Sequence, residues 1–284
     1  MDSFYTPSKI VDITIQNGVK KVQKRHRTQL LLSFLAGMFI AFAAYSGTMA
    51  MHSVQSVGPA RVLGGTIFPV GLMLVIFLGA ELFTGNCLIS LAVWDKKVKT
   101  WDMFKNLGIV FCGNLMGSFF IVCLCHLSGL WNTSGGLLGA YTINTALTKA
   151  TLAPIPALAS GILCNILVCG SILVMTMSTD MTGKIWGIFF TIMAFVVCGF
   201  EHSVANMYYL IAGLLAKTNP KYVEVAKETY GLTNEQLDSL NILNCLESTL
   251  FVSIGNMIGG MIFVSAIFFI IFKVLENPTS KKSE

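Results

Sequence analysis

The sequence contains a long apolar stretch that is interrupted near its middle by glycines and polar residues. The chain carries no charge from about Val62 to Leu78; residues 79–86 then read GAELFTGN, and apolar residues resume from Cys87 to Trp94. Lipid offers no partner to the backbone N–H and C=O groups that such a break frees. A break is therefore tolerated only where it is buried in protein or lines a wet cavity. Interrupted segments of this kind are typical of transport proteins, in which they form the binding site.

A second interruption of the same kind follows 120 positions later. Residues 201–206 read EHSVAN, so Glu81 and Asn86 have counterparts in Glu201 and Asn206. Both breaks share the pattern of a glutamate, three intervening residues, a small residue and an asparagine. Two matched breaks predict a duplicated permeation unit.

The composition indicates a membrane protein with several spans. Of 284 residues, 54% are hydrophobic and 12% are charged, whereas ordinary soluble domains carry about 25% charged residues. The net charge of +5 gathers near the ends of apolar segments, so we read it as topology information and expect no nucleic-acid partner. The eight cysteines lie almost wholly in apolar runs, and we interpret them as small buried hydrophobes with no disulfide framework, metal or other cofactor.

The apolar runs are numerous and long enough for six spans of about 20 residues each. We expect a kink at Pro69, a polar, glycine-rich loop leading to Lys149, and a mixed-charge loop over 217–244. The expected spans are 30–51, 60–94, 103–130, 154–178, 184–216 and 245–275.

Residues 1–29 carry apolar positions among lysines and arginines. This pattern predicts an amphipathic helix, capped by Ser8, in the headgroup plane; a solvated tail is the alternative. With six spans, fourteen of the nineteen lysines and arginines fall on the side of both termini, which predicts cytoplasmic termini in a cell (inner or plasma) membrane. The expected organisation is a cytoplasmic N-terminal helix (1–29), a transmembrane channel domain (30–275, repeats 30–130 and 151–275) and a cytoplasmic tail (276–284).

A second pair of matched motifs supports the duplication. Residues 113–117 read GNLMG and residues 255–259 read GNMIG, with glycines spaced to let helices approach closely. Three spans is an odd number, so the second half must be inverted relative to the first. We therefore predict an all-α fold of two inverted three-helix repeats, with helices two and five broken and the site between the halves. Asn165 is an intramembrane amide without a match in the first span.

The residues at the breaks suit the passage of an anion. An anion that enters an apolar constriction loses its hydration, and helix N-termini at the breaks offer free N–H groups to replace it. Lys149 can concentrate anions at the mouth, and His202 can donate a hydrogen bond or a proton to a weak-acid anion. We interpret Glu81 and Glu201 as supports for their own loops.

Other functions remain possible on this evidence. His202 could be a satisfied core histidine, and a channel cannot be separated from a proton symporter. An aquaporin-like channel for neutral solutes is the alternative, although neither break contains Asn-Pro-Ala. We expect no enzyme, because no cysteine lies beside His202 in its motif and no metal-ligand spacing occurs.

Three stretches resemble the formate/nitrite transporter family, in the right order and across all six segments. Residues 76–85 read IFLGAELFTG, residues 161–169 read GILCNILVC, and residues 199–207 read GFEHSVANM. The resemblance implies an aquaporin-like fold, a homopentamer with one pore per protomer, and permeation of small monovalent anions. Formate, nitrite, hydrosulfide and lactate are all carried within the family.

The resemblance also implies positions for two apolar constrictions. By position, Phe68, Leu72 and Phe195 would form the outer constriction. Leu82 would form the inner one, with Phe83 beside it on the loop at the first break.

A polar chamber between the constrictions is the last implication. His202, Thr84 and Asn165 would face this chamber, and Lys149 would attract anions at the outer mouth. Residues 149–152 read KATL and lack the histidines that often follow this lysine in formate channels. The general resemblance is therefore nearest to the hydrosulfide-conducting branch.

Overall fold

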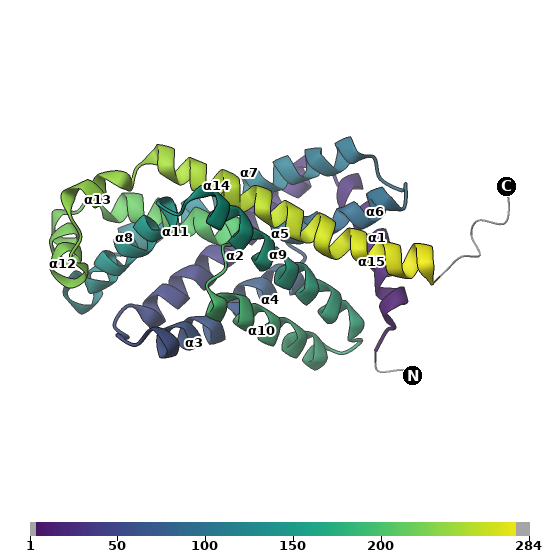
Figure 1. Cartoon of the computed structure of the whole chain (residues 1–284), viewed down its shortest axis with the longest axis horizontal. Coiled ribbons are helices and arrows are strands. Elements are labelled where there is room, and N and C mark those ends of the chain that lie inside the picture. The colour runs from purple at the N-terminus through teal and green to yellow at the C-terminus, as the bar shows by residue number, and fades with distance from the viewer. Residues whose placement is uncertain (1–3, 277–284) are drawn as a thin grey trace.

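The computed structural model describes residues 4–276, and within that range the regular structure is helical, with one isolated bridge between Phe4 and Ser178. Six segments are long and apolar enough to cross a membrane, which confirms the predicted all-α, six-span architecture (Figure 1). The predicted tail lies outside the described residues apart from Glu276. The six segments are α2 (His26–Met51), α3 with α4 (Val57–Phe77), α7 (Thr100–Leu127), α9 (Pro154–Met177), α10 (Met181–Cys198) and the last helix (Ile242–Leu275).

The second span is divided as predicted. Helices α3 (Val57–Ile67) and α4 (Pro69–Phe77) meet at Phe68, whose φ of −57° and ψ of −33° keep the backbone helical beside Pro69. Gly79 then adopts a φ of 69°, a left-handed conformation that suits glycine, and turns the chain out of the helix. After the loop the chain forms α5 (Phe83–Asn86), a 3₁₀ turn (Cys87–Ile89) and α6 (Ser90–Trp94).

The fifth span breaks in the same way. Helix α10 ends at Cys198, and Gly199 has a φ of 73°. The loop 199–202 follows, and α11 (Ser203–Ala216) completes the span. The last span consists of α14 (Ile242–Ile258) and α15 (Ile267–Phe269), with π-helical segments over Gly259–Ala266 and Ile270–Leu275.

The expected loop before Lys149 is wrong, because α8 (Leu137–Ala150) fills most of it. Buried Ile143, Leu147 and Ala150 recur at helical spacing, and α8 packs against α11. The mixed-charge loop likewise contains α12 (Pro220–Tyr230) and α13 (Asn234–Ser239). Glycine and polar residues hid the helical period of these segments.

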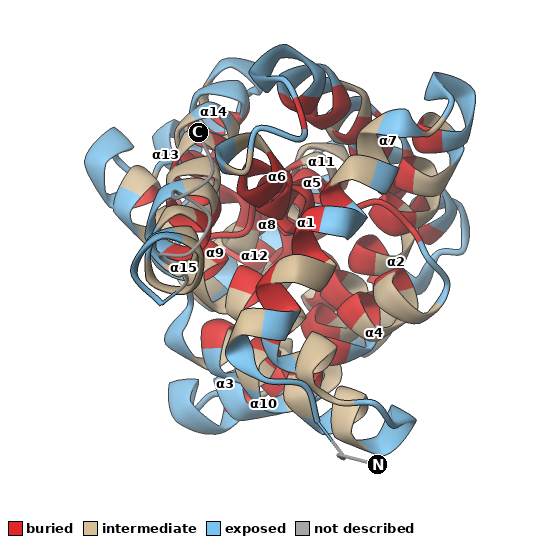
Figure 2. Cartoon of the chain, turned by 90° about the vertical axis from the view of Figure 1, so that its right-hand side faces the viewer, coloured by how far each residue is buried: buried red, intermediate tan, exposed pale blue. Residues whose placement is uncertain are grey.

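The N-terminal segment forms α1 (Pro7–Gln23), and its cap is Thr6, whose hydroxyl accepts from Lys9 N, rather than Ser8. The apolar face of α1 does not lie against headgroups: Val11 and Ile15 are fully buried, and α1 contacts α6 and α9. Viewed from this end, buried residues gather around α1, α5 and α6, and exposed residues lie at the rim (Figure 2). Helix α1 therefore packs over the helices at one end of the molecule.

Within each half, two helices pack closely through the matched glycines. Helix α7 packs on α2, and α14 packs on α9. A Cβ at Gly117 would lie 2.8 Å from Met38 N, and one at Gly255 would lie 3.1 Å from Ile162 N, so both contacts are backbone to backbone. The prediction of close helix approach is confirmed. Helix α1 and the end of the last helix lie at one end of the molecule, called the α1 side; α8, α12 and α13 lie at the other, called the α8 side (Figure 1).

Candidate functional site

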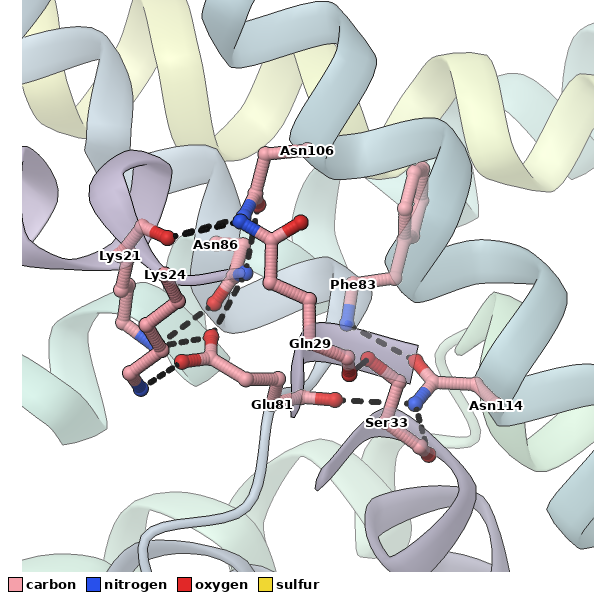
Figure 3. Close-up of polar contacts among 9 residues, drawn as sticks. All are labelled: Lys21, Lys24, Gln29, Ser33, Glu81, Phe83, Asn86, Asn106 and Asn114. Atoms are coloured by element: carbon pink, nitrogen blue, oxygen red, sulfur yellow. Dashed lines mark hydrogen bonds and ion pairs between the residues drawn. The ribbon is translucent and has the colours of Figure 1, made fainter. Parts of the chain in front are cut away.

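The carboxylate of Glu81 holds the loop on the α1 side and is completely buried. It accepts hydrogen bonds from Lys21 Nζ of α1 at 2.6 Å and from the Nζ of Lys24, the residue that follows the last turn of α1 (Figure 3). The amide of Asn86 donates to the same carboxylate at 2.9 Å. A buried carboxylate needs such pairing, because isolated burial of its charge is costly.

Lys21 connects the N-terminal helix to this loop more firmly than the sequence indicated. Its ammonium also donates to Asn86 Oδ1 at 2.8 Å, and its carbonyl accepts from Gln29 Nε2 at 2.9 Å. Burial lowers the pKa of Lys21, and the negative charge of Glu81 opposes that shift. Sequence reasoning placed Lys21 and Lys24 among headgroups; their three-residue spacing within the predicted helix was the available signal.

Glu201 holds the loop on the α8 side in a similar way. Lys149 Nζ lies 2.9 Å from each carboxylate oxygen, and Asn206 Nδ2 donates at 2.6 Å. The Lys149 ammonium also lies 5.1 Å from the centre of the Tyr209 ring. The positive charge of Lys149 is therefore offset by the carboxylate of Glu201.

Asn114 of α7 fixes the first loop from behind. Its Oδ1 accepts from Phe83 N–H at 2.9 Å, the first N–H of α5 (Figure 3). Its Nδ2 donates to Glu81 O at 3.0 Å and to Ser33 O at 2.8 Å. One side chain thus connects the loop, the helix after it and α2.

Asn256 of α14 makes the same three bonds in the second half. Its Oδ1 accepts from Ser203 N–H at 2.9 Å, and its Nδ2 donates to Glu201 O at 3.0 Å and Gly161 O at 2.8 Å. Backbone partners at equivalent positions and equal distances in both halves show the internal repeat at atomic detail.

Thr84 and His202 join the two loops. Thr84 Oγ1 lies 2.9 Å from His202 Nε2, and both side chains are buried. His202 Nδ1 accepts from Ala205 N–H at 3.1 Å and therefore carries no proton. The ring is then neutral, with its proton on Nε2, and that N–H donates to the Thr84 hydroxyl oxygen. The hydroxyl proton of Thr84 is left to donate elsewhere.

Asn165 reaches the same point from α9. Its Nδ2 donates to Thr84 O at 3.3 Å and to Asn256 O at 2.6 Å. Cys169 Sγ also donates to Thr84 O at 3.5 Å. The structure thus brings Thr84, His202 and Asn165 together, with the amide of Asn165 bonded to backbone.

Two cavities approach this contact from opposite sides. The α1-side cavity has a volume of about 400 Å³, and Leu72, Leu82 and Lys20 are among its lining residues. The α8-side cavity, of about 180 Å³, is lined by Phe68, Phe195, Lys149 and His202, among others. The structure therefore places Leu72 with Leu82 on the α1-side cavity.

Aromatic rings form the wall of the α8-side cavity. The rings of Phe68 and Phe195 meet edge to face at 5.4 Å, and the Phe195 and His202 rings are 6.0 Å apart. Phe83 lines neither cavity; its ring packs against Phe111 at 5.2 Å.

The structure has six spans, two broken helices and two cavities on either side of a buried polar contact. These features define a membrane transport protein. The family model described as "Formate/nitrite transporter" matches residues 8–270, and the chain belongs to that family. This confirms the family resemblance drawn from the three motifs.

Curated relatives are similar over nearly their whole length. The "Uncharacterized transporter YrhG" of Bacillus subtilis (strain 168) is 34% identical, over 95% of this chain and 94% of the relative. The "Formate channel FocA" of Escherichia coli (strain K12) is 30% identical, over 94% of each. These relatives are transporters and channels by name.

Solved structures have the same fold. A "Pentameric formate channel with formate bound" has a TM-score of 0.76 at 28% identity, covering 87% of this chain and 97% of that one. An "FNT family ion channel" has a TM-score of 0.78 at 23% identity, covering 93% and 98%, a likeness of fold alone.

Proposed function

We propose that this chain is a channel or proton-coupled transporter for small monovalent weak-acid anions, with formate, nitrite and hydrosulfide as the candidates. The observation that carries the proposal is the Thr84–His202 bond, because it lies between the two cavities and presents hydrogen-bond donors to a passing anion. Formate is the first anion to test, since the FocA relatives and one solved neighbour are formate channels by name.

Cations attract the anion into the α1-side cavity. Lys20 lines the α1-side cavity beside Lys21 and Lys24, which share the single carboxylate of Glu81. Such charge in a low-dielectric cavity raises the local concentration of anions. Lys149, paired with Glu201, holds the α8-side loop and adds little net charge of its own.

The apolar residues that line each cavity decide the form in which the anion crosses. Leu72 and Leu82 on one side and Phe68 and Phe195 on the other cannot replace water around a charge. His202 supports the anion through the Thr84 hydroxyl, whose proton is free to donate. A proton taken from water on the entry side and relayed through His202 and the Thr84 hydroxyl makes the anion a neutral acid, which releases a proton to water at the exit. If only hydrogen bonds are donated, the anion crosses without a proton.

The assembly and orientation also belong to this proposal. A homopentamer with one pathway per protomer is supported by the likeness to a pentameric neighbour. Both termini face the cytoplasm, because fourteen of the nineteen lysines and arginines fall on that side.

The test measures uptake into proteoliposomes with the pH controlled on each side. We expect labelled formate uptake to exceed that of chloride, which cannot be protonated, and of glycerol, which is neutral. The variant His202→Asn should assemble normally, lose roughly tenfold in formate flux, since a charge-assisted hydrogen bond contributes about 1.5–3 kcal/mol, and lose its pH dependence. Faster glycerol than formate uptake would favour the neutral-solute alternative. An intact pH profile in His202→Asn would remove the histidine from the mechanism.

A further inference from the structure

Arg61 lies at the outer end of the α8-side pathway and has no part in the loop clamps. It is exposed on α3, and its Nη1 donates to Val197 O at 3.4 Å. A Cβ at residue 199 would lie 3.2 Å from Arg61 Cζ, so Gly199 leaves the space that the guanidinium occupies. The guanidinium therefore rests against the loop that carries His202.

The charge of Arg61 is not offset, in contrast to that of Lys149. Within residues 4–276, no aspartate or glutamate forms an ion pair with it. No acidic side chain in that range lines the α8-side cavity or the second cavity beside it, which is described below. Arg61 thus contributes net positive charge where it lines these two cavities.

A second cavity of about 360 Å³ lies beside the first on this side, and we call it the antechamber. Met51, Arg61 and Tyr141 line both cavities, so they form the shared wall. Thr229 and Tyr230 of α12 line the antechamber as well. Burial raises the pKa of Tyr230 to about 12, so its hydroxyl remains a neutral donor.

We propose that the antechamber is an anion subsite in which Arg61 selects anions with two coplanar oxygens; this rests on the proposed function. A guanidinium presents parallel N–H groups that match a carboxylate or nitrite bidentately, whereas a lysine ammonium acts as a point charge. Hydrosulfide has a single acceptor atom and gains only from the charge. Arg61 thus favours formate and nitrite over hydrosulfide before either reaches His202.

The experiment compares three substitutions of Arg61 by initial uptake of radiolabelled formate and of hydrosulfide. Arg61→Gln can still donate to Val197 O but has no charge, and it should slow both anions severalfold, up to about tenfold, in dilute buffer. Arg61→Lys should slow formate about threefold and leave hydrosulfide unchanged, because it retains only the charge. Arg61→Glu should slow both most. These losses should shrink as salt rises from about 10 mM to about 1 M.

Lys221→Glu is the matched control. Lys221 is an exposed cation of α12 on the same side, lines neither cavity, and should leave both rates unchanged. Equal losses for both anions in Arg61→Lys would overturn the two-oxygen selectivity. An unchanged rate in Arg61→Gln in dilute buffer, or a loss insensitive to salt, would overturn the subsite. Wild-type uptake no faster than that of empty liposomes would instead overturn the proposed function itself.

Discussion

The loops on the α1 and α8 sides are built from the same parts but are connected to different neighbours. Each has a buried glutamate that accepts from the asparagine five residues later. Each is fixed from behind by Asn114 or Asn256 with the same three bonds. The cations differ, however: Lys21 of α1 and Lys24, just after α1, both pair with Glu81, whereas α8 supplies one lysine to Glu201.

The residues that precede the two half-helices also differ. Leu82 makes no side-chain cap, whereas His202 caps α11 by accepting from Ala205 N–H. Asn86 Oδ1 accepts from Lys21, while Asn206 Oδ1 has no partner among the described residues. The hydrogen bonds that hold the two loops, which we call the frame, are therefore symmetric, whereas the cations and the residues before the half-helices are not. Function is expected where the symmetry is broken, at His202 and at the cations, and stability where it is kept.

The largest effect should come from removing the loop carboxylates. Glu81→Leu leaves two lysines without their partner and should cost about 3–5 kcal/mol of folding stability. Glu201→Leu strands one lysine and should cost less, about 2–3 kcal/mol. Thermal unfolding in detergent, followed by tryptophan fluorescence, measures both.

Glutamine at each position is the matched control for those substitutions. It has nearly the same shape and keeps one acceptor oxygen, whereas leucine has none, so Glu81→Gln should lose less than Glu81→Leu. A stable Glu81→Leu pentamer with altered anion preference would assign Glu81 to the pathway and not to the frame.

Much of the fold could be predicted from the sequence, because the positions of charged residues and the repeated motifs indicate the spans and the internal repeat. The paired breaks and the GNLMG and GNMIG motifs revealed the repeat, and these patterns need no tertiary information. The partners of those residues could not be predicted. Lys21 and Glu81 are sixty residues apart, and only the docking of α1 brings them together. For the same reason Lys149 was expected to be a free cation, and Arg61 drew no attention.

A second, smaller effect should be equal in the two halves. Asn114→Leu and Asn256→Leu each orphan a buried N–H, of Phe83 or Ser203, and should each cost about 2–3 kcal/mol. Asn132→Leu, at an exposed site, is the control and should be neutral within about 0.5 kcal/mol. The same unfolding measurement applies. Unequal losses would mean that one loop is held by other contacts and that the repeat is not energetically symmetric.

The smallest expected effect is the difference in stability lost on removing Lys24 or Lys149, because the two loops differ most in their lysines. Lys24 is about one-third exposed, and Lys21 remains to pair with Glu81 when Lys24 is removed. Lys24→Met should therefore cost about 1 kcal/mol or less. Lys149 is less exposed and is the sole lysine paired with Glu201 in the described structure. Lys149→Met should cost about 2 kcal/mol, because it leaves a largely buried carboxylate unpaired. Adding Glu201→Gln to Lys149→Met removes that unpaired charge and should recover part of the loss. If Lys24→Met is the more damaging change, Lys24 is essential for holding Glu81 and Lys21 cannot replace it.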